Sequence, residues 1–394
     1  MTMRKGRITL SLALVGAVTV AAAVATTAAA QQDFPPGVLP GVKYGGSPNV
    51  KLLGHIPLGG YFRVMDDEIE QEMSRPYAYV SQSRDRPGFT IISLKEPEHP
   101  KVIYNWKIEN ASLHGGTGGM DGKYFKIHTK TGPKYYYVQS LQFGGSGPDA
   151  DLGAVVADVT GRPDTSKIKI VARMRFPEAP GGFHNIFAYK HSSGRVLLFA
   201  TVSGPFALVF DMEKVLAGDP GGGLIGRIQI PEDNNTAFGR AGFHDFQVFY
   251  DAASHQDRFY GAGRGGHYVY DITHPETPKL VTSIVGSAGV TFGHTFTPTP
   301  DQKTAVSEVE YEYAPLRIFD LTAGLEGKVQ TIHAPVGAWT ADWHDLSHNH
   351  EVFWPLVFVS AYEDGLQIFS LEDPKHPQTH GWYYTRSSQQ RRVG

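Results

Sequence analysis

Short apolar stretches separated by turn residues recur along this chain. In the clearest group, the apolar stretches 356–360 and 365–370 are followed by the turn Ser370-Leu371-Glu372-Asp373-Pro374. Similar closing turns follow 49 to 65 residues apart. Their first residues are Ser93, Asp158, Asp211, Asp271, Asp320 and Ser370. The pattern predicts six repeated units, each of about four short strands.

A four-stranded unit cannot bury both of its faces alone, so neighbouring units must stack and the ring must close. We therefore predict an all-β fold, a β-propeller with six four-stranded blades, closed by pairing between the two ends of the chain. A seven-bladed ring with one irregular blade is the first alternative. A pair of β-sandwiches is the second, although no linker divides the chain to support it.

Four successive units open on a histidine at one equivalent place. The first three histidines lie 27, 27 and 26 residues before their closing aspartates, and the fourth lies 26 residues before Ser370. They are His184, His244, His294 and His344. His348 follows in the same strand as His344 and is a rival for the fourth place.

The first strand of a propeller blade is innermost, so these histidines should converge at one mouth of the central channel. His114, in the connection leading into the second unit, should reach the same face. Neutral imidazole is a ligand for transition metals. The arc therefore predicts a divalent metal site for Fe, Cu, Zn or Mn, with an open side for water or a small-molecule substrate.

Antiparallel pairing brings the end of each second strand to the same mouth as the histidines. We predict catalytic roles there for Glu308 and Glu310, because a carboxylate can orient a ligand imidazole or act as a general base. Three more polar residues should lie near this mouth by the same reasoning: Gln139, Arg264 and Glu363.

A histidine followed by Asn or Asp can also belong to a turn, in which the Asn or Asp bonds the local backbone. That structural interpretation stays open for all four units. Four further histidines lie in linking strands or closing turns, where we expect ordinary surface residues: His55, His99, His274 and His376.

Composition narrows the chemistry further. The 394 residues carry a net charge of −3, which gives no sign of nucleic-acid binding. The chain has no cysteine, so disulfides, thiolate metal ligands and a cysteine nucleophile are all excluded.

The N-terminus has the pattern of an export signal. Arg4, Lys5 and Arg7 precede an apolar stretch, and small residues at 28–30 form a cleavage site. We predict a signal peptide over 1–30, an exposed leader over 31–47, the propeller over 48–385 and a polar tail over 386–394. The mature protein would then be secreted or periplasmic, without a transmembrane anchor. A retained anchor is the alternative.

Two segments, 362–374 and 268–275, resemble the LVIVD-repeat proteins, which are secreted or surface β-propellers. The resemblance implies a fold more than an activity, because many members of that family have no assigned chemistry.

Two functions from different classes follow. In the first, the protein is a metalloenzyme, an oxidase, oxygenase or lyase that acts on a small organic substrate. It is similar, by architecture alone, to the carotenoid oxygenases, which hold iron on axial histidines in a propeller. In the second, the protein is a non-catalytic binding or scaffold propeller of the cell envelope.

Overall fold

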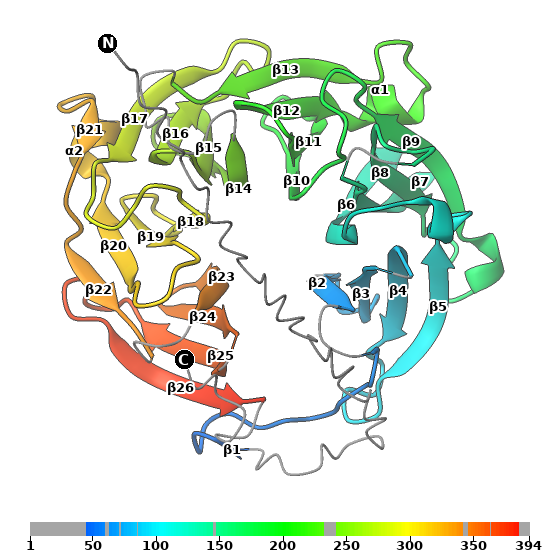
Figure 1. The fold of residues 1–394 in the computed structure, drawn as a ribbon, viewed down its shortest axis with the longest axis horizontal. Coiled ribbons are helices and arrows are strands. Elements are labelled where there is room, and N and C mark those ends of the chain that lie inside the picture. The colour runs from blue at the N-terminus through cyan, green and yellow to red at the C-terminus, as the bar shows by residue number, and fades with distance from the viewer. Residues whose placement is uncertain are drawn as a thin grey trace, which may run out of the picture. The chain divides into compact units, whose positions relative to one another are not determined.

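Six antiparallel sheets surround a common axis in the computed structural model (Figure 1). The structure describes residues 45–59, 63–70, 72–84, 86–144, 147–231, 242–341, 346–362 and 364–385. Each sheet is one blade of a propeller and follows the preceding blade along the chain. The predicted all-β fold and its six blades are therefore confirmed.

Each blade contains four strands that run outward from the channel in chain order. Blade 1 comprises β2 (Val64–Ile69), β3 (Tyr77–Gln82), β4 (Gly88–Ser93) and β5 (Lys101–Lys107). Blade 2 comprises β6 (Gly118–Thr129), β7 (Gly132–Gln142), β8 (Leu152–Asp158) and β9 (Lys169–Arg175). Blade 3 comprises β10 (Ile186–Lys190), β11 (Val196–Thr201), β12 (Phe206–Asp211) and β13 (Leu224–Gln229).

The second half of the ring repeats this arrangement. Blade 4 comprises β14 (Phe243–Asp251), β15 (Gln256–Gly263), β16 (Gly266–Asp271) and β17 (Lys279–Val285). Blade 5 comprises β18 (Thr295–Pro298), β19 (Thr304–Glu308), β20 (Leu316–Asp320) and β22 (Gly337–Trp339). Blade 6 comprises β23 (Ser347–Phe353), β24 (Leu356–Ala361), β25 (Gly365–Ser370) and β26 (Gln378–Tyr384).

Two short strands extend the outer edges of two blades. β1 (Gly45–Gly46) pairs antiparallel with β26, so segments from opposite ends of the described chain join in blade 6. This β1 falls within the range that the sequence assigned to an exposed leader. β21 (Thr331–Ile332) runs parallel to β17 at the edge of blade 4.

Helices are few and short in the described ranges. They are η1 (Ala111–Leu113), η2 (Thr165–Lys167), α1 (Met212–Leu216) and α2 (Thr322–Leu325). The Asp211 carboxylate accepts hydrogen bonds from two backbone N–H groups at the start of α1, which explains why a helix begins directly after β12. None of these helices has the length and apolar content that crossing a membrane requires.

The core lies between the blades. Middle strands such as β3 and β11 are buried along their whole length, because both faces of the sheet pack against a neighbouring blade. Five apolar clusters each join residues of two adjacent blades; Phe199 of blade 3 and Phe246 of blade 4, for example, share one cluster. Outermost strands are more exposed, and β9 alternates between exposed positions and positions that are at least partly buried.

The innermost strands share an irregularity at one level of the channel. In four of them the pairing register with the second strand shifts, which marks a β-bulge. The shifts lie at Val64/Asp67 in β2, Gly119/Gly122 in β6, Phe243/Asp245 in β14 and His348/His350 in β23. A bulge places an extra residue opposite one partner residue and re-aims the side chains around it.

A ring of polar residues, which we call the girdle, occupies this level with one residue from each blade. Its members are Asp66, Asp121, Asn185, Asp245, Thr295 and Asn349. Hydrogen bonds from the girdle cross the boundaries between neighbouring blades. They are Gly122 N to Asp66 Oδ2 (3.3 Å), Ile186 N to Asp121 Oδ2 (2.7 Å), Thr295 Oγ1 to Asp245 Oδ2 (3.5 Å), and Thr295 Oγ1 to Asn349 Oδ1 (2.9 Å).

Removing one girdle carboxylate should weaken the ring. Asp121→Ala deprives the Ile186 N–H and the Lys123 ammonium of a charged partner, so we expect the free energy of unfolding to fall by about 2–3 kcal/mol. Asp121→Asn keeps an acceptor oxygen and should cost less. Denaturant unfolding measures both variants. Glu326→Ala, which breaks a surface pair, is the control; an Asp121→Ala protein as stable as this control would contradict the role of the girdle.

Two buried histidines should make folding sensitive to acid. Burial lowers the pKa of His267 and of His350 to about 3, whereas an unfolded chain binds a proton at each ring near pH 6.5. Between these values the unfolded state therefore holds more protons, and each ring lowers stability by up to about 1.4 kcal/mol per pH unit as the pH falls. Urea unfolding at pH 7, 6 and 5 should give a shallower pH dependence for the His267→Leu/His350→Leu variant. An unchanged slope would show that the rings do not titrate in this way.

Candidate metal centre

Four histidines of blades 3 to 6 converge at the mouth of the channel, just above the girdle. Ring centroids lie 4.5 Å apart for His184 and His244, 3.9 Å for His244 and His294, and 4.8 Å for His294 and His348. Each histidine directly precedes a girdle residue in the sequence. Three of the histidines predicted for the arc, His184, His244 and His294, thus lie together with the rival candidate His348.

Glycines allow the chain to reach this mouth. Gly182 has a φ of 86°, a left-handed conformation that favours glycine, and it stands two residues before His184. A Cβ atom on Gly242, two residues before His244, would overlap the carbonyl oxygen of Gly204 in blade 3. Any larger residue at 242 would push the start of β14 away from the neighbouring blade.

The first pair of histidines offers two nitrogens at ligand spacing. His184 Nε2 lies 3.0 Å from His244 Nε2. Two nitrogens this far apart can each lie about 2.1 Å from one shared ion, at an angle of about 90°. The other ring nitrogen of His184, Nδ1, lies 3.3 Å from Gln142 Oε1, an acceptor that holds the proton on Nδ1 and leaves Nε2 as a lone-pair donor.

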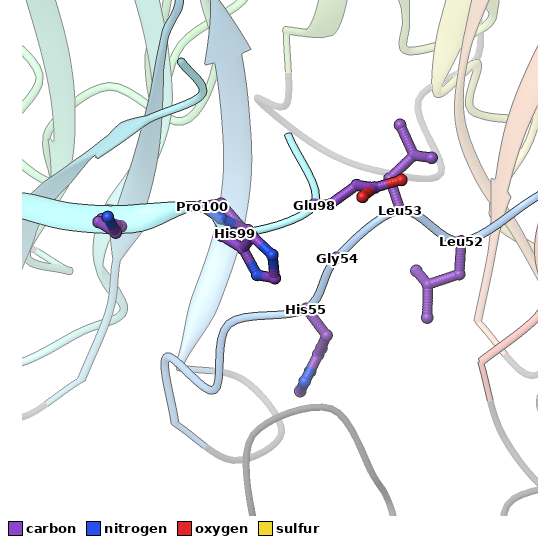
Figure 2. Close-up of a pocket in the computed structure, with 8 residues that line it drawn as sticks. Leu52, Leu53, Gly54, His55, Glu98, His99 and Pro100 are labelled. Carbon is purple, nitrogen blue, oxygen red and sulfur yellow. The ribbon is translucent and has the colours of Figure 1, made fainter. Parts of the chain in front are cut away.

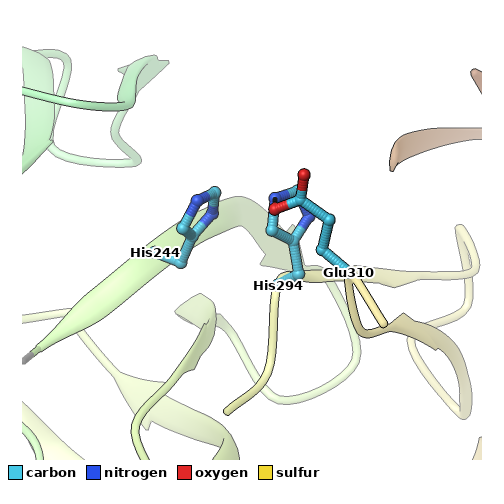
Figure 3. A group of neighbouring side chains, drawn as sticks. All are labelled: His244, His294 and Glu310. Carbon is cyan, nitrogen blue, oxygen red and sulfur yellow. Dashed lines mark ion pairs between the residues drawn. The ribbon is translucent and has the colours of Figure 1, made fainter. Parts of the chain in front are cut away.

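His294 stands between two carboxylates. Its Nδ1 donates to Glu308 Oε2 at 2.7 Å, and its Nε2 lies 3.4 Å from Glu310 Oε2. His244, His294 and Glu310 present ligand atoms that all lie within 4.8 Å of one another (Figure 3). Within the described ranges, this is the group of three His, Asp or Glu side chains whose ligand atoms lie close enough together to hold a metal.

The two predicted catalytic glutamates differ in exposure. The side chain of Glu308 is 1% exposed, whereas that of Glu310 is 35% exposed. Tyr362 donates its hydroxyl proton to Glu310 Oε1 at 2.6 Å, and its ring lies 5.2 Å from the ring of His348. Glu308 is thus an inner orienting group, and Glu310 is the carboxylate that can reach a molecule at the mouth.

Burial keeps most of the arc uncharged. It lowers the pKa of His184 and of His348 to about 4, with a further lowering from the nearby His294, and it lowers the pKa of His244 well below 6.5. For His294 burial acts in the same direction, but the charge of Glu308 and the hydrogen bond to it outweigh burial and raise the pKa. Three rings are therefore neutral at pH 7, which is the form that binds metals.

The other predicted residues have different places. His344 and Glu363 lie outside the described residues, and His348 occupies the fourth position of the arc. His114 follows η1, where its ring stacks on Phe143 at 4.5 Å and its Nε2 lies 3.6 Å from Asp149. These contacts belong to the rim of blade 2 rather than to the arc.

Two further polar residues were expected near the mouth. Gln139 is fully buried between blades 1 and 2, where its amide bonds Ser81 and the backbone of Asp121. Arg264 is buried at the end of the second strand of blade 4, and its carbonyl oxygen accepts from the Tyr268 hydroxyl.

Sequence reasoning missed two residues at the centre, Gln142 and Tyr362, and a pair of glutamates below it. Gln142 and Tyr362 lie at the ends of second strands, so the pairing argument that found Glu308 could have found them too. Glu68 and Glu351 project from innermost strands near Lys123, and burial raises the pKa of each carboxyl to about 7. Alternation within single strands gives no signal for this acidic level of the channel.

A pocket of about 460 Å³ lies away from this centre, between the linking segment 52–55 and residues 98–101 (Figure 2). Leu52 and Leu53 expose apolar surface there, and Glu98 pairs with Lys51 on the surface at 3.7 Å. Two histidines line it, His55 and His99. Their ring nitrogens and the Glu98 carboxylate do not all lie within 4.8 Å of one another, as the ligand atoms at the mouth do.

Comparison with known proteins shows the fold and no family. No protein-family model matches the chain, and no curated protein matches it. Among solved structures, Chaetomium thermophilum Sqt1 bound to the N-terminus of ribosomal protein L10 is similar, with a TM-score of 0.52 and 10% identity over 79% of this chain and 73% of that one.

Chains of the Chaetomium thermophilum Polycomb Repressive Complex 2 also match, for example in its autoinhibited apo form, with a TM-score of 0.47 and 13% identity over 64% of this chain. The chain spans about half the length of those Polycomb chains. The likeness to Sqt1 concerns the fold alone.

Proposed function

We propose that His184, His244, His294 and His348 form a transition-metal centre, for Fe, Cu, Zn or Mn, at the mouth of the propeller. The observation that carries the proposal is the 3.0 Å separation of two Nε2 atoms beside a third histidine that is oriented by a carboxylate. A donor set of imidazoles suits these metals better than Ca²⁺ or Mg²⁺, which prefer oxygen ligands.

The residues present fit a metal. The Nε2 atom of His294 is buried without a hydrogen-bond partner, whereas its Nδ1 is fixed by Glu308. This is the arrangement in which a second carboxylate orients a ligand imidazole and raises its basicity. Unpaired buried nitrogens cost stability, and a shared ion would satisfy them.

We further propose that the centre belongs to an oxidase, oxygenase or lyase for a small organic substrate. A bound ion would supply Lewis acidity at an open coordination position. Glu310, partly exposed and held by the Tyr362 hydroxyl, is placed to accept a proton from a substrate at the mouth. Glu308 would hold His294 in the ligand orientation and would not touch the substrate.

The alternative is a non-catalytic binding or scaffold propeller of the cell envelope. The Sqt1 structure, which contains the N-terminus of a ribosomal protein, supports it to the extent that a similar fold holds a polypeptide. In that case the histidines would serve the start of each blade. For either function we propose secretion through the signal peptide at 1–30, which lies outside the described residues.

Elemental analysis tests the centre directly. Mature protein purified from its native compartment without an affinity tag should carry about one equivalent of Fe, Cu, Zn or Mn. The His184→Ala/His244→Ala/His294→Ala variant should lose the metal while its circular dichroism stays that of a folded β protein. The exposed His376→Ala variant should keep it. Metal-free wild-type protein whose melting temperature does not respond to any of the four metals would sink the proposal and favour a scaffold.

Substitutions of Glu308 and Glu310 should change the metal affinity by different amounts. Glu308→Gln removes the charge behind His294 and should weaken metal binding about 10- to 100-fold in a competition titration with a chelator. Glu310→Gln should change metal affinity less, because Glu310 faces the mouth and its carboxylate is shared with Tyr362. Equal losses in both variants would show that Glu310 is a structural ligand and not a free base.

A further inference from the structure

The position of the four histidines has two counterparts in blades 1 and 2. In every blade one residue directly precedes the girdle residue at the mouth of the channel. Around the ring these six residues are Met65, Met120, His184, His244, His294 and His348. The arc of four imidazoles therefore belongs to a complete ring whose remaining two members are methionines.

Strand pairing fixes this equivalence. Two positions after Met65, Met120 and His348, each innermost strand pairs with the second strand of its blade. The pairs are Asp67 with Val80, Gly122 with Gln139, and His350 with Val359. The register shift lies directly before these pairs in all three blades. Met65 and Met120 thus occupy, at the bulges of blades 1 and 2, the position that His348 occupies at the bulge of blade 6.

Neighbouring contacts place the methionine strands against the histidine strands. Asp121, next to Met120, accepts the backbone N–H of Ile186, two residues after His184. Asp66, next to Met65, acts electrostatically on His348. Blades 1 and 2 therefore close the ring on the side that the histidines leave open.

Met120 is buried, with 9% of its surface exposed, and Met65 is half-buried, and neither belongs to the apolar clusters of the described blades. The next level of the channel consists of Asp, Asn and Thr, so an apolar side chain at this level needs another reason. A thioether is a soft, polarisable ligand.

We propose that Met65 and Met120 supply thioether sulfur to the centre and make it a copper site that binds Cu(I). Thioether ligands select Cu(I), whereas Zn, Fe and Mn prefer the nitrogen and oxygen donors of the arc. This inference rests on the proposed metal centre and specifies its metal and two further ligands. In this proposal the four imidazoles and two thioethers would surround one ion.

The test compares metals in matched variants. Met65→Leu/Met120→Leu removes both sulfurs at nearly constant volume, and Met73→Leu, at a residue 95% exposed, is the control. In competition with a Cu(I) chelator, the double variant should bind Cu(I) at least about tenfold more weakly than wild type, while its affinity for Zn²⁺ stays unchanged. Single variants serve if the double variant does not fold.

X-ray absorption at the copper edge gives an independent measurement on the unaltered chain. Wild-type protein loaded with Cu(I) should show a sulfur shell, which selenomethionine labelling should convert to a selenium shell. A Cu(I) site without sulfur, or an unchanged affinity in the double variant, would overturn this inference and leave the histidine centre intact. Failure of wild-type protein to bind any metal would instead remove the centre itself.

Discussion

The hydrogen bonds that the girdle makes across blade boundaries are the interaction on which the rest of the structure depends. Each blade buries its apolar faces against its neighbours, but apolar packing has no direction and does not fix how far one blade slides along the next. A carboxylate of one innermost strand that accepts a backbone N–H of the next, as Asp121 does from Ile186, sets that register. This hydrogen bond fixes the register at the channel, where all six blades meet.

A backbone irregularity in blades 4 and 6 helps to shape the candidate centre. A bulge turns two adjacent residues of an innermost strand toward the channel, where regular alternation would send one of them into the blade. One of the two, such as Asp245, joins the girdle, and the other, such as His244, reaches the mouth. In blades 4 and 6 the girdle residue and the histidine at the mouth therefore share one local geometry, whereas His184 and His294 precede strands whose pairing shows no register shift.

This coupling explains what the sequence could predict. The repeat of closing turns and the position of His184 and His244 before their strands were enough for the six blades and most of the arc. The fourth member, His348, lies four residues further along than the spacing gave, because the first strand and hairpin of blade 6 are shorter: β24 begins eight residues after His348, whereas β15 begins twelve residues after His244. His114 was assigned from a connection whose path no pattern of residues fixes. The members of the ring in blades 1 and 2 are Met65 and Met120, so a search for repeated histidines did not include them.

The girdle also bears on whether the histidines are simply part of the turns. A turn role would fall to the short polar residue that bonds the neighbouring backbone, and Asp121 already fills that role in a blade whose preceding residue is methionine. Blade 2 thus forms its junction without a histidine, which leaves the imidazoles of blades 3 to 6 without a necessary structural task. Two neutral imidazoles can share one N–H···N hydrogen bond, so the 3.0 Å contact between His184 Nε2 and His244 Nε2 is satisfied when His244 holds its proton on Nε2. A bound ion would replace that hydrogen bond with a bond to each nitrogen, and it would also satisfy the Nε2 atom of His294, which has no hydrogen-bond partner.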